Sequence, residues 1–153
     1  MAADPSEAPQ LTLTVTRKSH VADDIYLFEL RDGGGELPAF SPGSHVAVTT
    51  PSGQKRRYSL CNDCGERDRY VIAIKQETTG RGGSLSFTTQ VNEGDQVQVD
   101  APANEFEMSS AEPKSTIFIA GGIGITPIRS ISATWSGAAE KTSGSTISPA
   151  RLR

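Results

Sequence analysis

Apolar and polar residues alternate strictly near the start of the chain. Leu11, Leu13 and Val15 fall on one face of residues 11–18, and threonines fall on the other. A period of two is typical of a strand with one buried face. Similar β-rich runs recur over the first hundred residues, separated by glycine and proline. The pattern predicts six strands, at residues 11–18, 25–31, 45–50, 57–61, 70–76 and 96–101.

Short strands separated by turn residues indicate a small antiparallel barrel or sandwich. One segment interrupts this pattern, at residues 84–90. Ser84 can act there as an N-cap, and Leu85, Phe87 and Val91 have a spacing that suits packing on a neighbouring surface. We therefore predict an all-β fold with one short helix.

The pattern changes after residue 101. Residues 102–114 are polar and rich in turn residues, and residues 115–120 form a compact apolar strand that runs directly into a glycine-rich stretch. Such a transition is typical of the opening of an α/β domain. The last 24 residues hold many serines and threonines but few large apolar side chains, so a frayed helix stub and a flexible tail are expected. The expected organisation is a flexible N-terminus over residues 1–10, a barrel over 11–112, the first part of an α/β domain over 113–129 and a tail over 130–153.

Length and charge restrict the function further. A chain of 153 residues holds one domain or slightly more, and its net charge of −3 argues against nucleic-acid binding through a broadly basic surface. No apolar run approaches the roughly 18 residues that cross a bilayer, and no secretory signal is visible at the N-terminus. We expect a cytoplasmic protein without membrane contact. In that reducing setting the two cysteines are expected to be free thiols.

The most informative stretch is Arg-Arg-Tyr-Ser-Leu at residues 56–60. Alternation places Arg56 and Tyr58 on one face of a strand, and Arg57 and Ser59 on the other. A guanidinium binds phosphate, a tyrosine offers a flat wall, and a serine hydroxyl can donate to a ring nitrogen or carbonyl. Together they suit a phosphorylated planar ligand. An exposed basic strand with one packed tyrosine is the alternative that these residues leave open.

Two glycine-rich stretches add to this candidate site. Residues 79–84 (Thr-Gly-Arg-Gly-Gly-Ser) precede the predicted helix, where main-chain amides can bind an anion, although glycines before a helix are often only a turn. Residues 121–127 (Gly-Gly-Ile-Gly-Ile-Thr-Pro) follow a predicted strand and allow a ligand to approach the main chain. They do not match the G-x-G-x-x-G pattern, and the acidic residue of that pattern has no clear place here.

Cys61 and Cys64 are spaced as in some zinc and redox motifs. They follow the Arg-Arg-Tyr-Ser-Leu strand in a polar turn without two further ligands, so incidental spacing is the favoured interpretation. His20 and His45 are isolated from each other and from any carboxylate pattern. We therefore predict no metal site.

Four motifs occur in a fixed order at residues 40–46, 56–60, 80–84 and 121–127. In this order they resemble the ferredoxin-reductase-type flavin domain, and within that superfamily the chain is most similar to the phthalate dioxygenase reductase and vanillate demethylase reductase family. The resemblance runs from about Leu11 to Ile128. It implies a six-stranded Greek-key barrel that binds FMN, with FAD as the alternative.

The resemblance also implies a role for individual residues. Arg56 would pair with the flavin phosphate, Tyr58 would pack near the isoalloxazine and ribityl chain, and Ser59 would hydrogen-bond near flavin N5. Thr126 would lie near the ring. Arg57 and Lys75 can equally be solvated strand charges. The cofactor-binding residues implied in total are Arg56, Arg57, Tyr58, Ser59, Ala73, Ile74, Lys75, Gly82, Gly83, Ser84 and Thr126, and the remnant of the NAD site is Gly121, Gly122 and Gly124.

Members of this family pass electrons from NAD(P)H through flavin to a 2Fe-2S cluster, and from there to an oxygenase component or ferredoxin. These 153 residues end early in the nicotinamide domain, and a plant-type cluster needs four cysteines where only two occur. The resemblance therefore implies the flavin-binding part of an oxidoreductase, truncated in its NAD-binding domain and expected to lack full activity alone. A cofactor-free β-barrel interaction module is the competing hypothesis.

Overall fold

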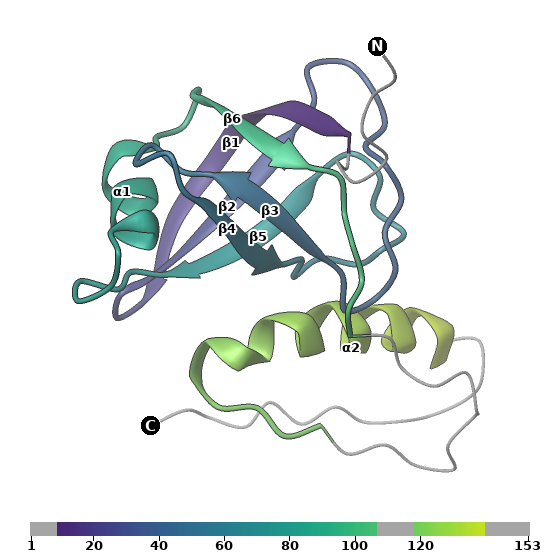
Figure 1. Cartoon of the computed structure of the whole chain (residues 1–153). Coiled ribbons are helices and arrows are strands. Elements are labelled where there is room, and N and C mark those ends of the chain that lie inside the picture. The colour runs from purple at the N-terminus through teal and green to yellow at the C-terminus, as the bar shows by residue number, and fades with distance from the viewer. Residues whose placement is uncertain (1–8, 107–117, 140–153) are drawn as a thin grey trace.

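A computed structural model describes residues 9–106 and 118–139 of the chain, with side chains described up to residue 134. Six strands form one antiparallel sheet, and two helices lie outside it (Figure 1). The strands are β1 (Gln10–Ala22), β2 (Ile25–Arg31), β3 (His45–Thr49), β4 (Lys55–Ser59), β5 (Tyr70–Lys75) and β6 (Gln96–Asp100). The helices are α1 (Gly83–Gln90) and α2 (Ile125–Ala139), and a short 3-10 turn, η1 (Gly122–Gly124), precedes α2.

The predicted β-sheet fold is confirmed, and each of the six strands predicted between residues 11 and 101 is present. The largest difference is in β1, which runs past residue 18 because its ladder with β2 continues to the pair Ala22 and Ile25. Irregularities in that ladder after Val15 and His20 shift the register, so the strict alternation of the early residues does not extend over the whole strand. Sequence alternation alone therefore underestimates its length.

The sheet has the strand order β4-β3-β6-β1-β2-β5, in which β6 lies between β3 and β1. This crossing agrees with the predicted Greek-key arrangement. The sheet curls but does not close, because the edge strands β4 and β5 share no continuous ladder. The described pairing between them lies just beyond the end of β4, in a single bridge between Leu60 and Ile72 and a hydrogen bond from Cys61 N to Val71 O of 2.8 Å. The predicted six-stranded barrel is therefore present with an open seam between these strands.

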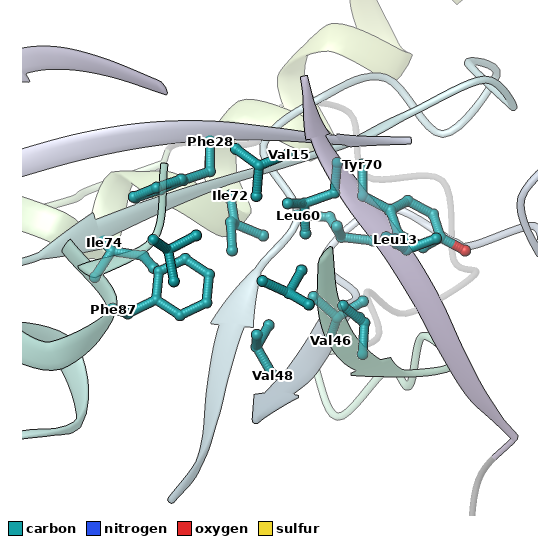
Figure 2. Close-up of a cluster of buried hydrophobic side chains, with 14 of the residues drawn as sticks. Leu13, Val15, Phe28, Val46, Val48, Leu60, Tyr70, Ile72, Ile74 and Phe87 are labelled. Carbon is teal, nitrogen blue, oxygen red and sulfur yellow. The ribbon is translucent and has the colours of Figure 1, made fainter. Parts of the chain in front are cut away.

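The hydrophobic core lies inside the curled sheet (Figure 2). Alternating residues of β1, β2, β3, β5 and β6 direct their apolar side chains inward, as the sequence pattern predicts. Phe28 of β2 meets Phe87 of α1 edge-to-face, with ring centroids 5.0 Å apart. Phe87 thus attaches α1 to the end of the core. The most deeply buried side chains include Leu13, Val15, Phe28, Leu30, Val46, Val48, Leu60, Tyr70, Ile72, Ile74 and Phe87.

The start of α1 differs from the prediction in one respect. The N-cap is Gly82, not Ser84, and no side chain caps the helix. Gly82 has a φ of 82°, a left-handed conformation that glycine adopts without a side-chain penalty. The Ser84 hydroxyl instead accepts a hydrogen bond of 3.0 Å from the main-chain N–H of Glu77.

After β6, the structure describes residues 101–106 and then the chain from residue 118 onward. Residues 118–120 form no strand in the structure, and residues 115–117 of the predicted strand lie outside the described residues. Helix α2 begins at Ile125, earlier than the predicted helix stub, and buries Ile131 completely. The predicted flexible segments fall mainly on residues 1–8 and 140–153, outside the described part, although Gln10 already belongs to β1. Neither described helix is long and apolar enough to cross a membrane.

Both cysteines are free thiols, and Cys61 is buried beside the seam with only 5% of its surface exposed. Burial raises the pKa of the Cys61 thiol to about 11, although the Arg129 charge and a hydrogen bond with the Ala73 main chain act in the opposite direction. Cys61 is therefore protonated at neutral pH, the form that burial favours.

The attachment of α1 by Phe87 can be tested by truncation. A Phe87→Ala change removes a fully buried ring and should lower the free energy of unfolding by roughly 3–5 kcal/mol. Urea unfolding followed by circular dichroism measures this loss. Val21→Ala is the control, since Val21 is 54% exposed and its truncation should stay within about 0.5 kcal/mol. Equal losses for the two variants would contradict the assigned role.

The buried Cys61 thiol predicts a pH dependence of stability. Its pKa is raised in the folded state. The stabilising contribution of the neutral thiol to the free energy of unfolding is therefore fully present below the ordinary pKa near 9 and is lost as the pH rises toward 11. Between pH 8 and pH 10.5 the wild-type protein should lose roughly 1–2 kcal/mol more than Cys61→Ala does. Denaturant unfolding at both pH values measures the difference, and parallel losses would contradict it.

Candidate functional site

A cavity of about 660 Å³ lies where the sheet fails to close. Its walls come from the edge strands β4 and β5, from the glycine-rich loop that leads into α1, and from η1 with the start of α2. The open seam places this cavity between segments that are far apart in the sequence. The lining residues are Arg56, Arg57, Tyr58, Ser59, Ala73, Lys75, Glu77, Gly80, Arg81, Gly82, Gly83, Ser84, Ile123, Gly124, Thr126 and Pro127.

The structure brings most of the sequence-predicted site residues to this one cavity. Ile74 is the exception among the cofactor-binding candidates, because its side chain is fully buried in the core. Any contact that it makes with a ligand would have to come from its main chain. Of the three glycines predicted near the nicotinamide site, Gly124 lines the cavity, whereas Gly121 and Gly122 do not.

Positive charge dominates the cavity wall, with four cationic side chains and a single carboxylate, that of Glu77. Two of the cations are paired: Arg57 with Glu105 at 2.8 Å, and Lys75 with Glu77 at 3.5 Å. Within residues 9–106 and 118–134, Arg56 and Arg81 have no carboxylate partner. Their charge is available to an anion at the glycine-rich end of the cavity.

Arg56 lies directly across the buried main chain of Gly83. A Cβ atom built on Gly83 would be 2.8 Å from Arg56 Nε and 3.2 Å from its Cγ, so any side chain there would displace the arginine. Glycine at this position therefore permits the close approach of Arg56, and its φ is not left-handed. The guanidinium is held against the first turn of α1.

The first turn of α1 presents a second group that favours an anion. No side chain caps this end, and no acidic residue lies in the first turn. The amide groups and the dipole of a helix N-terminus attract negative charge. Ser84 uses its hydroxyl oxygen as an acceptor for Glu77 N, so its own proton remains free to donate. Arginine and helix start thus converge on one end of the cavity.

Tyr58 contributes an unsatisfied polar group. Its ring lies 6.4 Å from that of Phe87, and its hydroxyl is buried without a hydrogen-bond partner among the described residues. A buried, unpaired hydroxyl lowers the stability of the folded chain. Burial raises the pKa of Tyr58 to about 12 against the opposing charge of Arg56, so the phenol stays neutral and can donate.

The opposite end of the cavity carries no unpaired charge. Thr126 is only 7% exposed, and its hydroxyl donates to the carbonyl of Ile123 at 3.0 Å, which leaves the oxygen able to accept. Ile123 of η1 and Pro127 of α2 add apolar surface, and Ala73 adds apolar surface from β5. A cavity with a cationic end and a largely apolar end matches a planar ligand with a phosphate group.

Sequence reasoning assigned no role to some residues of this site. Arg81 stands inside a recognised glycine-rich motif, so its position was a usable signal. Gln54 lies before the motif strand, yet its side chain hydrogen-bonds to both Arg56 and the Arg81 carbonyl. No pattern in the sequence indicates these contacts, because they depend on how the β3–β4 turn meets the loop before α1.

The cysteine pair lies away from this cavity. Cys61 lines a separate cavity of about 640 Å³, together with Glu29, Arg69 and Arg129. Cys64 Sγ is 3.4 Å from the Thr134 hydroxyl of α2. In the part of the chain that the structure describes, no three His, Cys, Asp or Glu side chains gather as metal ligands.

Comparison with known proteins places this geometry in a family, although no protein-family model matches the chain. Phthalate dioxygenase reductase from Burkholderia cepacia is 49% identical over 128 residues, which are 83% of this chain and 39% of the relative. Vanillate O-demethylase oxidoreductase from Pseudomonas putida is 44% identical over 114 residues, which are 74% of this chain and 36% of the relative.

A solved structure agrees with these relatives. It is described as phthalate dioxygenase reductase, a modular structure for electron transfer from pyridine nucleotides to [2Fe-2S]. It superposes with a TM-score of 0.82 at 47% identity, and covers 84% of this chain and 40% of the solved one. The chain thus spans about two fifths of the length of these proteins. It belongs to the phthalate dioxygenase reductase and vanillate demethylase reductase family, whose ferredoxin-reductase-type fold it shares over the N-terminal flavin domain.

Proposed function

We infer that the chain is the flavin-binding part of an oxygenase reductase, and that its cavity binds FMN, with FAD as the alternative. One observation carries this proposal: Arg56, with no carboxylate partner in the described part of the chain, lies across Gly83 at an uncapped helix start. Together they offer charge and amide donors to one phosphate. A guanidinium and a helix N-terminus are each suited to a phosphate group.

The ring end of the proposed ligand would lie toward α2. In this arrangement the Tyr58 ring would pack near the isoalloxazine and ribityl chain, and Ser59 and Thr126 would border the ring. Ala73 and Lys75 of β5, with the main chain of Ile74, would line its edge. Bound flavin would supply the exchange between two-electron and one-electron transfer, and the protein would bind it, orient it and limit the access of water.

The electron donor and acceptor are proposed from the relatives. The description of the solved relative names pyridine nucleotides as donors and a [2Fe-2S] centre as acceptor. We propose NAD(P)H as the donor, with Gly121, Gly122 and Gly124 opening its site, and an iron-sulfur centre and an oxygenase component or ferredoxin as later acceptors. The domain limits are likewise proposed as a flavin domain over residues 11–112 followed by the start of a nicotinamide domain over 113–129.

Flavin titration of the purified protein tests the proposal. Quenching of flavin fluorescence should show saturable binding of FMN, and Arg56→Ala should weaken that binding by about 1.5–3 kcal/mol, the range for a hydrogen bond to a charged group. Arg17→Ala on β1 is the control, since Arg17 lies outside the cavity. A chain that takes up neither FMN nor FAD would favour the cofactor-free interaction module, and unchanged affinity in Arg56→Ala would remove Arg56 from the site.

A substitution at Gly83 tests the close approach without touching a charge. Gly83→Ala should push Arg56 away from the helix start and weaken FMN about tenfold, while alanine remains compatible with the first helical turn. Calorimetric titration measures the affinity. Gly33→Ala is the matched control, because a Cβ at Gly33 meets nothing within 4 Å. An FMN affinity equal to that of Gly33→Ala would contradict the proposal that Arg56 and the start of α1 bind the phosphate together.

A further inference from the structure

Gln54 connects the two halves of the proposed phosphate site. It follows the β3–β4 turn, and its amide lies between the guanidinium of Arg56 and the loop that leads into α1. Its Oε1 accepts a hydrogen bond from Arg56 Nη2, and its Nε2 donates to the main-chain carbonyl of Arg81 at 2.5 Å. We propose that Gln54 is a positioning residue, which sets Arg56 against the helix start and thereby gives the cavity its preference for a phosphorylated flavin.

The two ends of the amide are matched to their partners. The guanidinium can only donate, and the carbonyl of Arg81 can only accept. A rotated amide would place NH₂ against Arg56 and oxygen against the carbonyl, so only one orientation is favourable. The side chain therefore fixes the separation between β4 and the glycine-rich loop as well as the direction of the guanidinium.

A neutral side chain is required for this role. Glutamate at residue 54 could accept from Arg56, but its charge would compete with a phosphate for the guanidinium and would repel the Arg81 carbonyl. Glutamine holds Arg56 without neutralising it. The positive charge thus stays available, in agreement with the absence of a carboxylate partner for Arg56 among the described residues.

The turn that carries Gln54 is itself attached to α1. Ser86 Oγ lies 3.2 Å from Ser52 Oγ, and the main-chain N–H of Gln54 donates to Thr50 Oγ1 at 3.2 Å. Arg56 makes one further bond, from Nη1 to the Lys55 carbonyl at 3.2 Å, which is local to its own strand. Gln54 is therefore the described side chain that ties the guanidinium to the loop before α1.

The test compares FMN with riboflavin, which lacks the phosphate, and it rests on the proposed function. Gln54→Met keeps the length of the side chain but removes both hydrogen bonds, and Gln54→Glu keeps only the acceptor. Both should weaken FMN by about tenfold or more and leave the riboflavin affinity within about twofold. Fluorescence titration with each flavin measures the two affinities. Gln98→Met is the control, because Gln98 of β6 is exposed and pairs with Thr12.

Each outcome decides the inference. A selective loss of FMN affinity in Gln54→Glu supports it even where Gln54→Met folds poorly, as melting temperature would reveal. Equal losses for FMN and riboflavin would mean that Gln54 serves only the fold, and would overturn the inference. Wild-type affinity in both variants would also overturn it and leave the proposed function intact. If the wild-type chain itself binds no flavin, the proposed function and this inference fail together.

Discussion

The placement of one guanidinium against a helix start is the constraint on which the site depends. Arg56 can lie over the first turn of α1 because Gly83 has no side chain, and Gly82 turns the loop into that position with a positive φ. Phe87 holds the helix by packing its ring into the core against Phe28. The proposed anion-binding end of the cavity thus depends on core packing. A change that loosened α1 would separate donors that only work together.

The open sheet gives this site its place. A fully closed barrel would pair β4 with β5 along their length, whereas here the two strands meet at a single bridge beyond Ser59. The C-terminal parts of β4 and β5 line the same cavity as the start of α2. Incomplete pairing of β4 and β5 therefore leaves groups of both strands beside the cavity. The same open seam shapes the sheet and the candidate site.

The sequence predicts much of the fold but less of the site. Strands such as β2 are found at the predicted residues, because alternation and flanking glycines report local geometry directly. Most residues of the Arg-Arg-Tyr-Ser-Leu and glycine-rich motifs meet at the cavity. The N-cap at Ser84 was wrong, because Gly82 caps the helix and the Ser84 hydroxyl accepts a hydrogen bond from the main-chain N–H of Glu77. The sequence does not indicate a role for Gln54, because its contacts with Arg56 and the Arg81 carbonyl depend on where the β3–β4 turn places it.

The central claim is that a phosphate binds between Arg56 and the start of α1, and a crystal structure of the protein soaked with FMN tests it most directly. The account predicts density for the phosphate within hydrogen-bond distance of the Arg56 guanidinium and of the Gly83–Ser84 main chain, with the ring extending toward Thr126. Flavin density in the separate cavity beside Glu29 and Arg129, or none anywhere at saturating FMN, would contradict the account.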